Sequence, residues 1–365
     1  MADKDFVGHR SEIGDTFPGS VFAKYEMTLK TRRKISGITL SILGLLCGAL
    51  GYRAEASVAL LMEEPYGEFG AFNPTGHAAM YLSNICADTP TRLRMCHDGE
   101  YGSVISRYHK VDGYDWVAIP LIPYLYAVET IDQIPASVDK AKAEQLRDAY
   151  RKAHLERLAP DTPDGGTPKG EWVQLVGSSY DRTIHGFQVD TTPEQDESFL
   201  AYVNDEKNVG HFNLFFHNCA DFSRAALDHY FPHAVHRNYI ADAGITTPKQ
   251  VAKALVGYSK KHPDLHMTAF TIPQVPGDMP RSHRVDGVTE SLVKSKKYII
   301  PLVILNPEVA GGIVVAYLVD GRSHPPKNAQ VFQIDDAEVT NASLVPDVRD
   351  GRTPLPAPSV DSPTK

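Results

Sequence analysis

The stretch FNLFFHNCADFSRAALDHY, residues Phe212–Tyr230, decides how the rest of the chain is interpreted. An apolar run leads into His217-Asn218-Cys219, and the residues after it have helical spacing. Asn218 is a favourable N-cap residue, so the pattern predicts Cys219 in the first turn of a helix. Unpaired backbone N–H groups and the helix dipole favour a thiolate there. Cys219 is therefore a candidate nucleophile, and the alternative is a small buried side chain on the inner face of the helix.

The other cysteines help to decide whether Cys219 is a nucleophile or a buried core side chain. The chain has four: Cys47, Cys86, Cys96 and Cys219. Cys47 lies in an apolar segment with the character of an export signal, while Cys86 and Cys96 flank a short polar loop at a separation that suits a disulfide. Cys219 is then left without a partner in a chain predicted to be exported, and this supports a chemical role for its thiol.

Composition bounds the class of protein. The chain has 365 residues, of which 42% are hydrophobic and 22% charged, and these are the proportions of a folded protein. A net charge of −8, with no basic cluster to offset it, argues against a nucleic-acid partner. Gly311-Gly312 has no phosphate-binding context, so no cofactor is predicted.

One set of histidines has spacing that resembles a metal site: His229, His233 and His236. Pro232 interrupts the helix there, and no glutamate accompanies the histidines as a metallohydrolase base would. The set is interpreted as a solvated helix end, so no metal site is predicted, and a metal-dependent hydrolase is kept as a weaker rival.

Residues 1–56 are predicted to be an N-terminal extension that contains an export signal. Read from Met27, a basic segment precedes the apolar run Ile35–Leu50 and an A-x-A cleavage site that ends at Ala56. The segment is either removed or kept as a membrane anchor. In both cases we expect the protein in the periplasm or cell envelope.

Residues 57–258 carry the pattern of one α+β domain. Alternating apolar segments separated by Asp/Gly turns predict an antiparallel meander with strands at His77–Leu82, Arg92–Cys96, Val104–Tyr108 and Trp116–Leu121. Further strands are expected at Trp172–Val176 and Arg182–Val189, and helices at 136–158, 191–204 and 247–255. The acidic pairs Glu63-Glu64 and Asp335-Asp336 are interpreted as solvated surface.

The last third changes character. Residues 259–297 read as a polar linker and 320–365 as a Pro-rich tail that need not fold. Between them, the apolar segment Tyr298–Val319 is long enough to span a bilayer but contains two prolines and Glu308. It is interpreted as either a membrane-spanning helix or two apolar strands around an Asn306-Pro307 turn.

A thiol nucleophile needs a base beside it. His77 follows a Pro-Thr-Gly turn and opens a predicted strand, which would give its ring a rigid platform. His217 is two residues from Cys219 and is better placed to frame an oxyanion site together with Asn218, although the backbone N–H of Cys219 is the usual donor.

Together these motifs resemble the circularly permuted papain-like hydrolases, which include NlpC-type cell-wall peptidases and lecithin retinol acyltransferase-like enzymes. The similarity covers about residues 69–230 and rests on Gly76-His77 through Leu82 and on Phe216-His-Asn218-Cys219 through Arg224. Residues 180–195 also look like an uncharacterised bacterial envelope branch with this fold. The resemblance implies a permuted papain-like α+β fold, in which an antiparallel meander packs against the helix that carries the cysteine.

The resemblance also implies a third polar residue, on the strand after the histidine strand, that orients the base. His97 is the nearest suitable residue, and Glu100 and His109 are alternatives.

The sequence therefore predicts an exported thiol hydrolase, an amidase, peptidase or acyltransferase, in which Cys219 attacks and His77 transfers the proton. A peptidoglycan stem peptide is the first substrate to consider, and a lipid ester or amide is the second. The rival prediction is a catalytically inactive envelope scaffold that keeps the fold for binding.

Overall fold

The computed structural model describes residues 56–67, 70, 74–109, 111, 113–322 and 329–332, all of which belong to one compact unit, Ala54–Lys365. The predicted export signal, apart from Ala56, and most of the Pro-rich tail lie outside the described residues.

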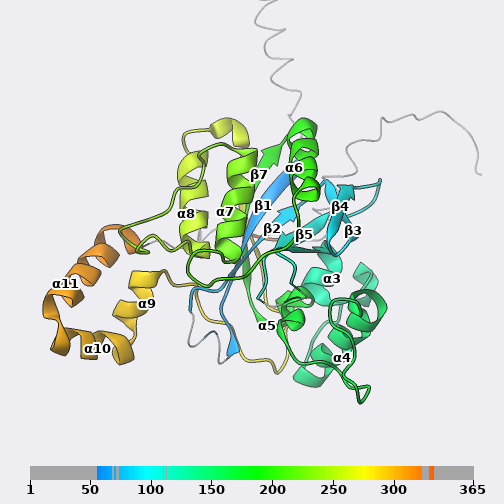
Figure 1. Ribbon diagram of the computed structural model, residues 1–365, viewed down its shortest axis with the longest axis horizontal. Coiled ribbons are helices and arrows are strands. Elements are labelled where there is room, and N and C mark those ends of the chain that lie inside the picture. The colour runs from blue at the N-terminus through cyan, green and yellow to red at the C-terminus, as the bar shows by residue number, and fades with distance from the viewer. Residues whose placement is uncertain are drawn as a thin grey trace, which may run out of the picture. The chain divides into compact units, whose positions relative to one another are not determined.

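A seven-stranded sheet forms the centre of this unit (Figure 1). The sheet order is β6-β5-β2-β1-β7-β8-β9, and every neighbouring pair is antiparallel except β8 and β9. The strands are β1 (Ala56–Glu63), β2 (His77–Leu82), β5 (Ser103–Ser106), β6 (Val117–Pro120), β7 (Ile184–Thr191), β8 (Thr268–Ile272) and β9 (Gln330–Val331). The described part of the chain is thus mixed α+β, with a mostly antiparallel sheet.

The central strand β1 was not predicted from the sequence. All eight of its residues, ASVALLME, are buried, because the strand lies between β2 and β7 and both faces of the sheet are covered. Val58 and Leu60 pack into the core on one face, and Ala59 and Leu61 into the core on the other. A strand buried on both faces shows no alternation of polar and apolar residues, which is the usual signal of a strand.

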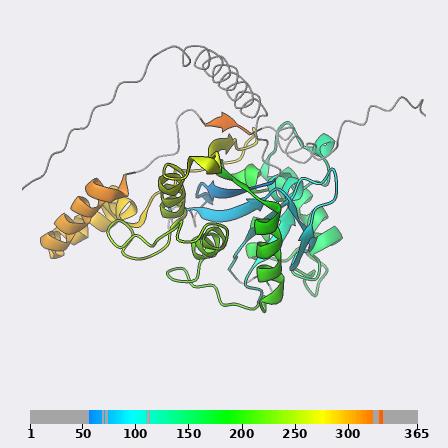
Figure 2. The same ribbon diagram turned by 90° about the horizontal axis from the view of Figure 1, so that it is seen from above.

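Helices cover both faces of the sheet (Figure 2). One layer holds α6 (Pro193–Asp205), α7 (Cys219–Tyr230) and α8 (Pro248–Ser259). The other holds α3 (Leu121–Tyr126), α4 (Lys140–Tyr150), the π-helical turn η2 (Arg151–Leu155), the 3-10 helix η3 (Glu171–Leu175) and α5 (Ser178–Asp181). Two further 3-10 turns are η1 (Ile131–Gln133) and η4 (Pro263–Leu265).

The predicted helices with polar caps are confirmed: Thr192 caps α6 and Thr247 caps α8. The strand predicted at Trp172–Val176 is wrong, because these residues form η3. There the Trp172 indole N–H donates to the carbonyl of Pro168, and the ring packs into the core.

β3 (Ile85–Thr89) and β4 (Arg92–Met95) form a separate two-stranded sheet. In sequence they lie between β2 and β5, which are neighbours in the main sheet. Cys86 and Cys96 are joined by a disulfide across this hairpin. Because β3 and β4 pair only with each other, the strand that lies beside β2 in the main sheet is β5.

The fold continues past residue 258, where the sequence predicts a linker: β8 pairs with β7, and α9 (Val288–Lys294) follows. The apolar segment 298–319 is not a pair of strands. It forms α10 (Lys296–Leu305), α11 (Pro307–Ala316) and the start of the π-helical turn η5 (Tyr317–Gly321), with α10 and α11 meeting at Asn306. Among the described residues, no helix has the length and apolar character needed to cross a membrane.

Candidate functional site

Cys219 is the first residue of α7, as predicted. Asn218 caps the helix: its Oδ1 accepts the N–H of Asp221 at 2.9 Å, and the Asp221 carboxylate accepts the N–H of Asn218 at 3.3 Å. This reciprocal pair satisfies two N–H groups that a helix start otherwise leaves open. The cap therefore fixes where the chain turns into the helix and holds the thiol there.

His77 is the first residue of β2, also as predicted. The preceding Gly76 has φ +72°, and a Cβ on it would lie 2.1 Å from the carbonyl oxygen of Glu63. Only glycine can make this turn without displacing β1. The turn sets the point at which β2 begins, and with it the position of the His77 ring.

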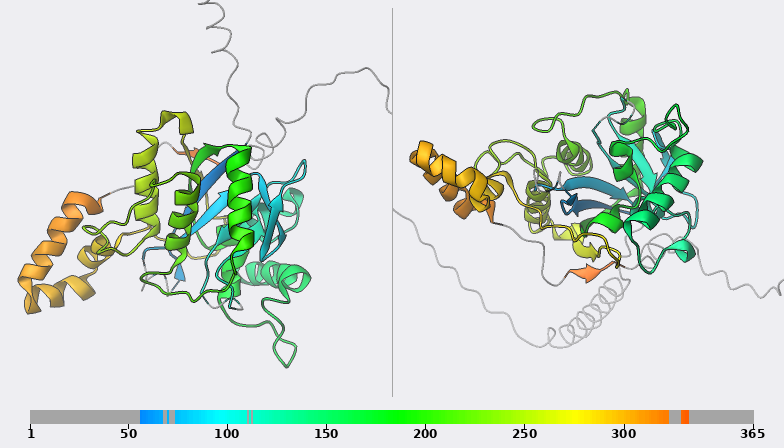
Figure 3. Two further views of the ribbon diagram at one scale, coloured as in Figure 1. Left: turned by 45° about the horizontal axis from the view of Figure 1, so that its top comes forward. Right: turned by 90° about the horizontal axis from the view of Figure 1, so that it is seen from below.

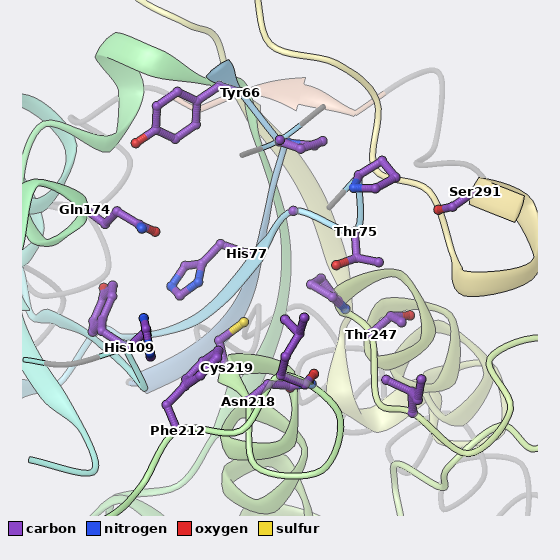
Figure 4. A pocket seen from close by; sticks show the side chains of 18 of the residues that line it. Tyr66, Thr75, His77, His109, Gln174, Phe212, Asn218, Cys219, Thr247 and Ser291 are labelled. Atoms are coloured by element: carbon purple, nitrogen blue, oxygen red, sulfur yellow. The ribbon is translucent and has the colours of Figure 1, made fainter. Parts of the chain in front are cut away.

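Both side chains line one cavity of about 800 Å³. Figure 4 shows the Cys219 thiol and the His77 imidazole projecting into it from the two elements. The backbone N–H of Ala78, the residue after His77, lies beside the Cys219 sulfur and favours its thiolate form by lowering the pKa of the thiol. The sulfur thus lies against the start of β2, and nucleophile and base candidate share one wall of the cavity.

Ser106, the last residue of β5, touches the ring of His77. Its Oγ lies 3.1 Å from His77 Nε2 and donates to the carbonyl of Ala78 at 2.7 Å. Because the hydroxyl hydrogen is used on Ala78, Oγ accepts from Nε2–H. This network assigns the neutral tautomer with an unprotonated Nδ1, the form that can take a proton from a thiol.

The polar side chain that contacts the His77 ring is thus Ser106 and not His97. His97 is exposed on the turn after β4, outside the cavity lining, where its backbone N–H donates to Glu100. Glu100 forms an ion pair with Arg94, and His109 lines the cavity with its ring against Phe212. The strand that follows His77 in sequence is part of the β3–β4 hairpin, whereas the strand beside it in space is β5.

Burial keeps both members of the pair uncharged. Burial lowers the pKa of His77 to about 4, a shift that Glu63 opposes and Arg182 reinforces. Burial raises the pKa of the Cys219 thiol to about 11, although the N–H groups of Ala78 and Ala220 favour the thiolate. Loss of hydration thus outweighs the helix start, and the expectation of a partial thiolate is corrected: at pH 7 the pair is thiol and neutral imidazole.

A buried polar network lies behind His77. Glu63, opposite His77 in the β1–β2 register, is 1% exposed, so its interpretation as solvated surface is wrong. Its carboxylate pairs with Arg182 at 3.0 Å and accepts hydrogen bonds from Tyr124 and from Ser178, the latter at 2.9 Å. Tyr108 completes this wall by stacking on the His77 ring, with 5.0 Å between ring centroids.

The two residues predicted to frame an oxyanion site have structural hydrogen bonds instead. Asn218 Nδ2 donates to the carbonyls of Leu214 and Thr246 at 2.9 and 3.1 Å, which uses both of its hydrogens. His217 Nε2 lies 2.8 Å from Asp115, which also forms an ion pair with Arg107 at 2.6 Å. These bonds fix the loop before α7, and the backbone N–H of Cys219 remains the donor candidate.

The three histidines with metal-like spacing do not form a site. His229 stacks on Tyr202 and lies 3.1 Å from Ser198, whereas His233 and His236 lie beside each other with ring centroids 6.3 Å apart. Among the residues that the structure describes, the one group of three with ligand atoms close enough for a metal is Cys86, Cys96 and Glu100, and its two cysteines are bonded to each other.

Comparisons of the chain with family models, with curated proteins and with solved structures find no match. The chemistry of the cavity has to be inferred from its geometry.

Proposed function

We propose that the protein is a thiol hydrolase or acyltransferase that uses Cys219 and His77, on a circularly permuted papain-like fold. The observation that carries the proposal is that a helix-N-terminal thiol and an imidazole whose Nε2 is held by Ser106 line the same cavity. A nucleophile, a base and a group that orients the base are the three parts that acyl transfer by a thiol needs.

The reaction proceeds from the neutral pair. As the Cys219 sulfur attacks a carbonyl carbon, its proton passes to Nδ1 of His77, and the oxyanion is stabilised by the backbone N–H of Cys219. The imidazolium then returns the proton to the leaving nitrogen or oxygen as the bond from that atom to the carbonyl carbon breaks. Water, or a second acceptor, releases the acyl group from the sulfur. The hydrogen bond to Ser106 keeps the ring aligned through both transfers.

The lining favours an acyl substrate over an acidic stem peptide. Among the described residues that line the cavity, the arginines are Arg107 and Arg182, and they are already paired with Asp115 and Glu63. Leu214 and Phe215 line one side of the cavity, and Leu292 and Tyr298 line it from the helices α9 and α10. An ester or amide with an apolar acyl chain therefore suits the cavity better than a peptide with several carboxylates, which would need free cations.

An envelope location is part of the proposal. The disulfide between Cys86 and Cys96 supports it, because such bonds persist in oxidising compartments such as the periplasm.

Acyl-enzyme trapping tests this function. The full chain is incubated with p-nitrophenyl butyrate or with a muropeptide that carries a stem peptide, and peptide mapping locates any acyl group. We expect a butyryl group on Cys219, little reaction with the muropeptide, and no acyl group at this position in Cys219→Ala. Acylation elsewhere in the chain, with Cys219 unmodified, would contradict the proposal.

One observation favours the non-catalytic alternative, a binding protein with the same fold. The raised pKa of Cys219 and the lowered pKa of His77, both caused by burial, leave the thiol in its less reactive form. In that case p-nitrophenyl esters would leave Cys219 unmodified even at high pH, and Cys219→Ala would bind ligands in the cavity as well as the original chain does.

A further inference from the structure

The helical hairpin formed by α10, α11 and η5 exposes an unusual amount of apolar surface. Ile304 and Leu305 are 74% and 83% exposed, and no residue of α10 is buried. On α10, Ile300, Val303 and Ile304 follow helical spacing and share one exposed face, and Val315, Leu318 and Val319 repeat this pattern at the end of the hairpin. Figures 1 and 3 show the hairpin standing away from the helices that cover the sheet.

The two ends of the hairpin, which lie at opposite ends of α9 and are together called its base, have the composition of a membrane interface. Tyr298, near the start of α10, has the Lys297 ammonium 5.9 Å from its ring centroid, and Tyr317, at the start of η5, has the Arg322 guanidinium at 5.4 Å. Lys296 adds a third exposed cation. Within the described part of the chain, none of these three cations has a carboxylate partner. Tyrosines beside unneutralised cations, next to an apolar surface, suit a bilayer with anionic headgroups.

The length of α10 and α11 limits how the two helices can be oriented in a bilayer. Ten residues of α-helix extend about 15 Å, half of the roughly 30 Å hydrocarbon core, so neither α10 nor α11 can cross it. Asn306 and the exposed Glu308 form the turn between the helices, and these polar groups oppose insertion of the tip. The hairpin is therefore suited to lie along the interface with its apolar side chains in the acyl region.

The Cys219 cavity shares lining residues with the start of the hairpin. Ser295 and Tyr298, around the start of α10, line the cavity. The loop before α7 also lines it, with Leu214 and Phe215, and Phe215 and Phe216 are 54% and 62% exposed. Exposed apolar side chains from two separate segments are thus near one cavity.

We infer that the α10–α11 hairpin binds the surface of a lipid bilayer and places the mouth of the Cys219 cavity against it. The partner is the headgroup and upper acyl region of an anionic bilayer, held by apolar burial along the hairpin and by Lys296, Lys297 and Arg322 at its base. This attachment requires no thiol chemistry.

A fluorescent probe at the hairpin tests the inference directly. In the full chain with Cys47→Ser and Cys219→Ser, an environment-sensitive dye is attached at Leu305→Cys and, as a control, at Val331→Cys on β9, where the valine is 60% exposed. Vesicles of phosphatidylcholine and phosphatidylglycerol are added at low and high salt. We expect a blue shift at position 305 and none at position 331. We also expect Ile304→Glu/Leu305→Glu to lower the bound fraction by at least about tenfold, and Val331→Glu to leave it unchanged.

Three results would overturn the inference. One is an absence of vesicle binding. Another is binding with no change at position 305, which would assign the attachment to another segment, such as the apolar run 35–50. The third is a blue shift at position 305 that needs no vesicles and grows with protein concentration, which would show that a second copy of the chain covers the hairpin. Because the probe protein lacks the Cys219 thiol, none of these results bears on the proposed chemistry.

Discussion

At the scale of single residues, Ser106 determines what the imidazole can do. A histidine with a free choice of tautomer would present an unprotonated Nδ1 for only part of the time. Ser106 donates to the carbonyl of Ala78 and accepts from Nε2, so the proton is held on the far side of the ring from the nitrogen that acts. In the proposed mechanism, a single hydroxyl thus takes the orienting role for which a histidine or a carboxylate is expected.

Removing this hydroxyl should slow acylation without unfolding the protein. For Ser106→Ala we predict that the rate of butyryl transfer from p-nitrophenyl butyrate to Cys219 falls about fivefold, because the base loses one hydrogen bond of about 1 kcal/mol. Ser103→Ala is the matched control. Ser103 is a buried serine of the same strand, and its Oγ accepts from the N–H of Ala87 and does not contact His77. Equal rates for the two variants would remove Ser106 from the site.

The pH dependence of the thiol follows from burial. The pKa of Cys219 is raised to about 11, so its thiolate fraction in the folded protein increases about tenfold for each pH unit above pH 7. We predict that alkylation of Cys219 by iodoacetamide, followed by peptide mapping, rises from pH 7 to pH 9.5 without a plateau. In urea the alkylation rate of the same residue should be half-maximal at about pH 8.5, the ordinary pKa of a cysteine, and should level off above it. A plateau at or below this value in the folded protein would indicate a preformed thiolate–imidazolium pair.

At the scale of elements, the site is a meeting of one helix start and one strand start. The capping box of Asn218 and Asp221 holds the start of α7, and Gly76 sets the start of β2. Asp221 also binds Arg237 at 2.7 Å and Thr246 at 2.6 Å, so the cap is tied to the loop before α8. His217, Asn218 and Asp221, on either side of Cys219, therefore each have a structural partner, which explains why the thiol has a defined position.

Two caps of the same kind allow stability and chemistry to be separated. Asn218→Ala on α7 and Thr192→Ala on α6 each remove the side chain of a capping box, and we predict that each lowers the free energy of unfolding by about 1–2 kcal/mol. Urea denaturation measures this loss. Only Asn218→Ala should also slow the acylation of Cys219. A comparable slowing in Thr192→Ala would mean that the rate follows overall stability instead of the position of the thiol.

At the scale of the whole molecule, a buried ion pair connects the sheet to the helices behind the site. Glu63 ends β1, Arg182 precedes β7, and Ser178 on α5 and Tyr124 on α3 bond to the same carboxylate. Removing one charge would leave the other buried and unpaired.

This arrangement predicts a large effect of a small change. Glu63→Gln keeps the size of the side chain but leaves Arg182, which is 3% exposed, without its counter-charge, and we expect the free energy of unfolding to fall by about 3–5 kcal/mol. Glu144→Gln, which removes the exposed partner of Lys140, should change it very little. Similar urea midpoints for the two variants would contradict a supporting role for the Glu63 pair.

The sequence predicted the parts of the molecule that depend on local signals. Asn218 before Cys219, Thr192 before Pro193 and Thr247 before Pro248 each place a cap beside the first turn of a helix, and all three helices form. The strand that starts at His77 is likewise marked by a turn.

The parts that were missed depend on contacts between distant segments. β1 carries no alternation because both of its faces are buried, and Glu63 appears solvated in sequence because its partner Arg182 lies far along the chain. The position of Ser106 beside His77 could have been predicted from the disulfide. A disulfide between Cys86 and Cys96 implies that the segment between them pairs with itself, so the next strand, Ser103–Ser106, has to lie beside β2.

The most direct test of the central claim, that His77 acts as the base for Cys219, is chemical rescue of the acylation burst. Stopped-flow release of p-nitrophenolate is followed in the full chain, in His77→Ala, and in His77→Ala with added imidazole, which is small enough to enter a cavity of about 800 Å³. We predict a burst of one equivalent in the original chain, a rate lowered by about 100-fold or more in His77→Ala, and partial recovery with imidazole. A burst that is absent from the original chain, or one that His77→Ala leaves unchanged, would contradict the claim.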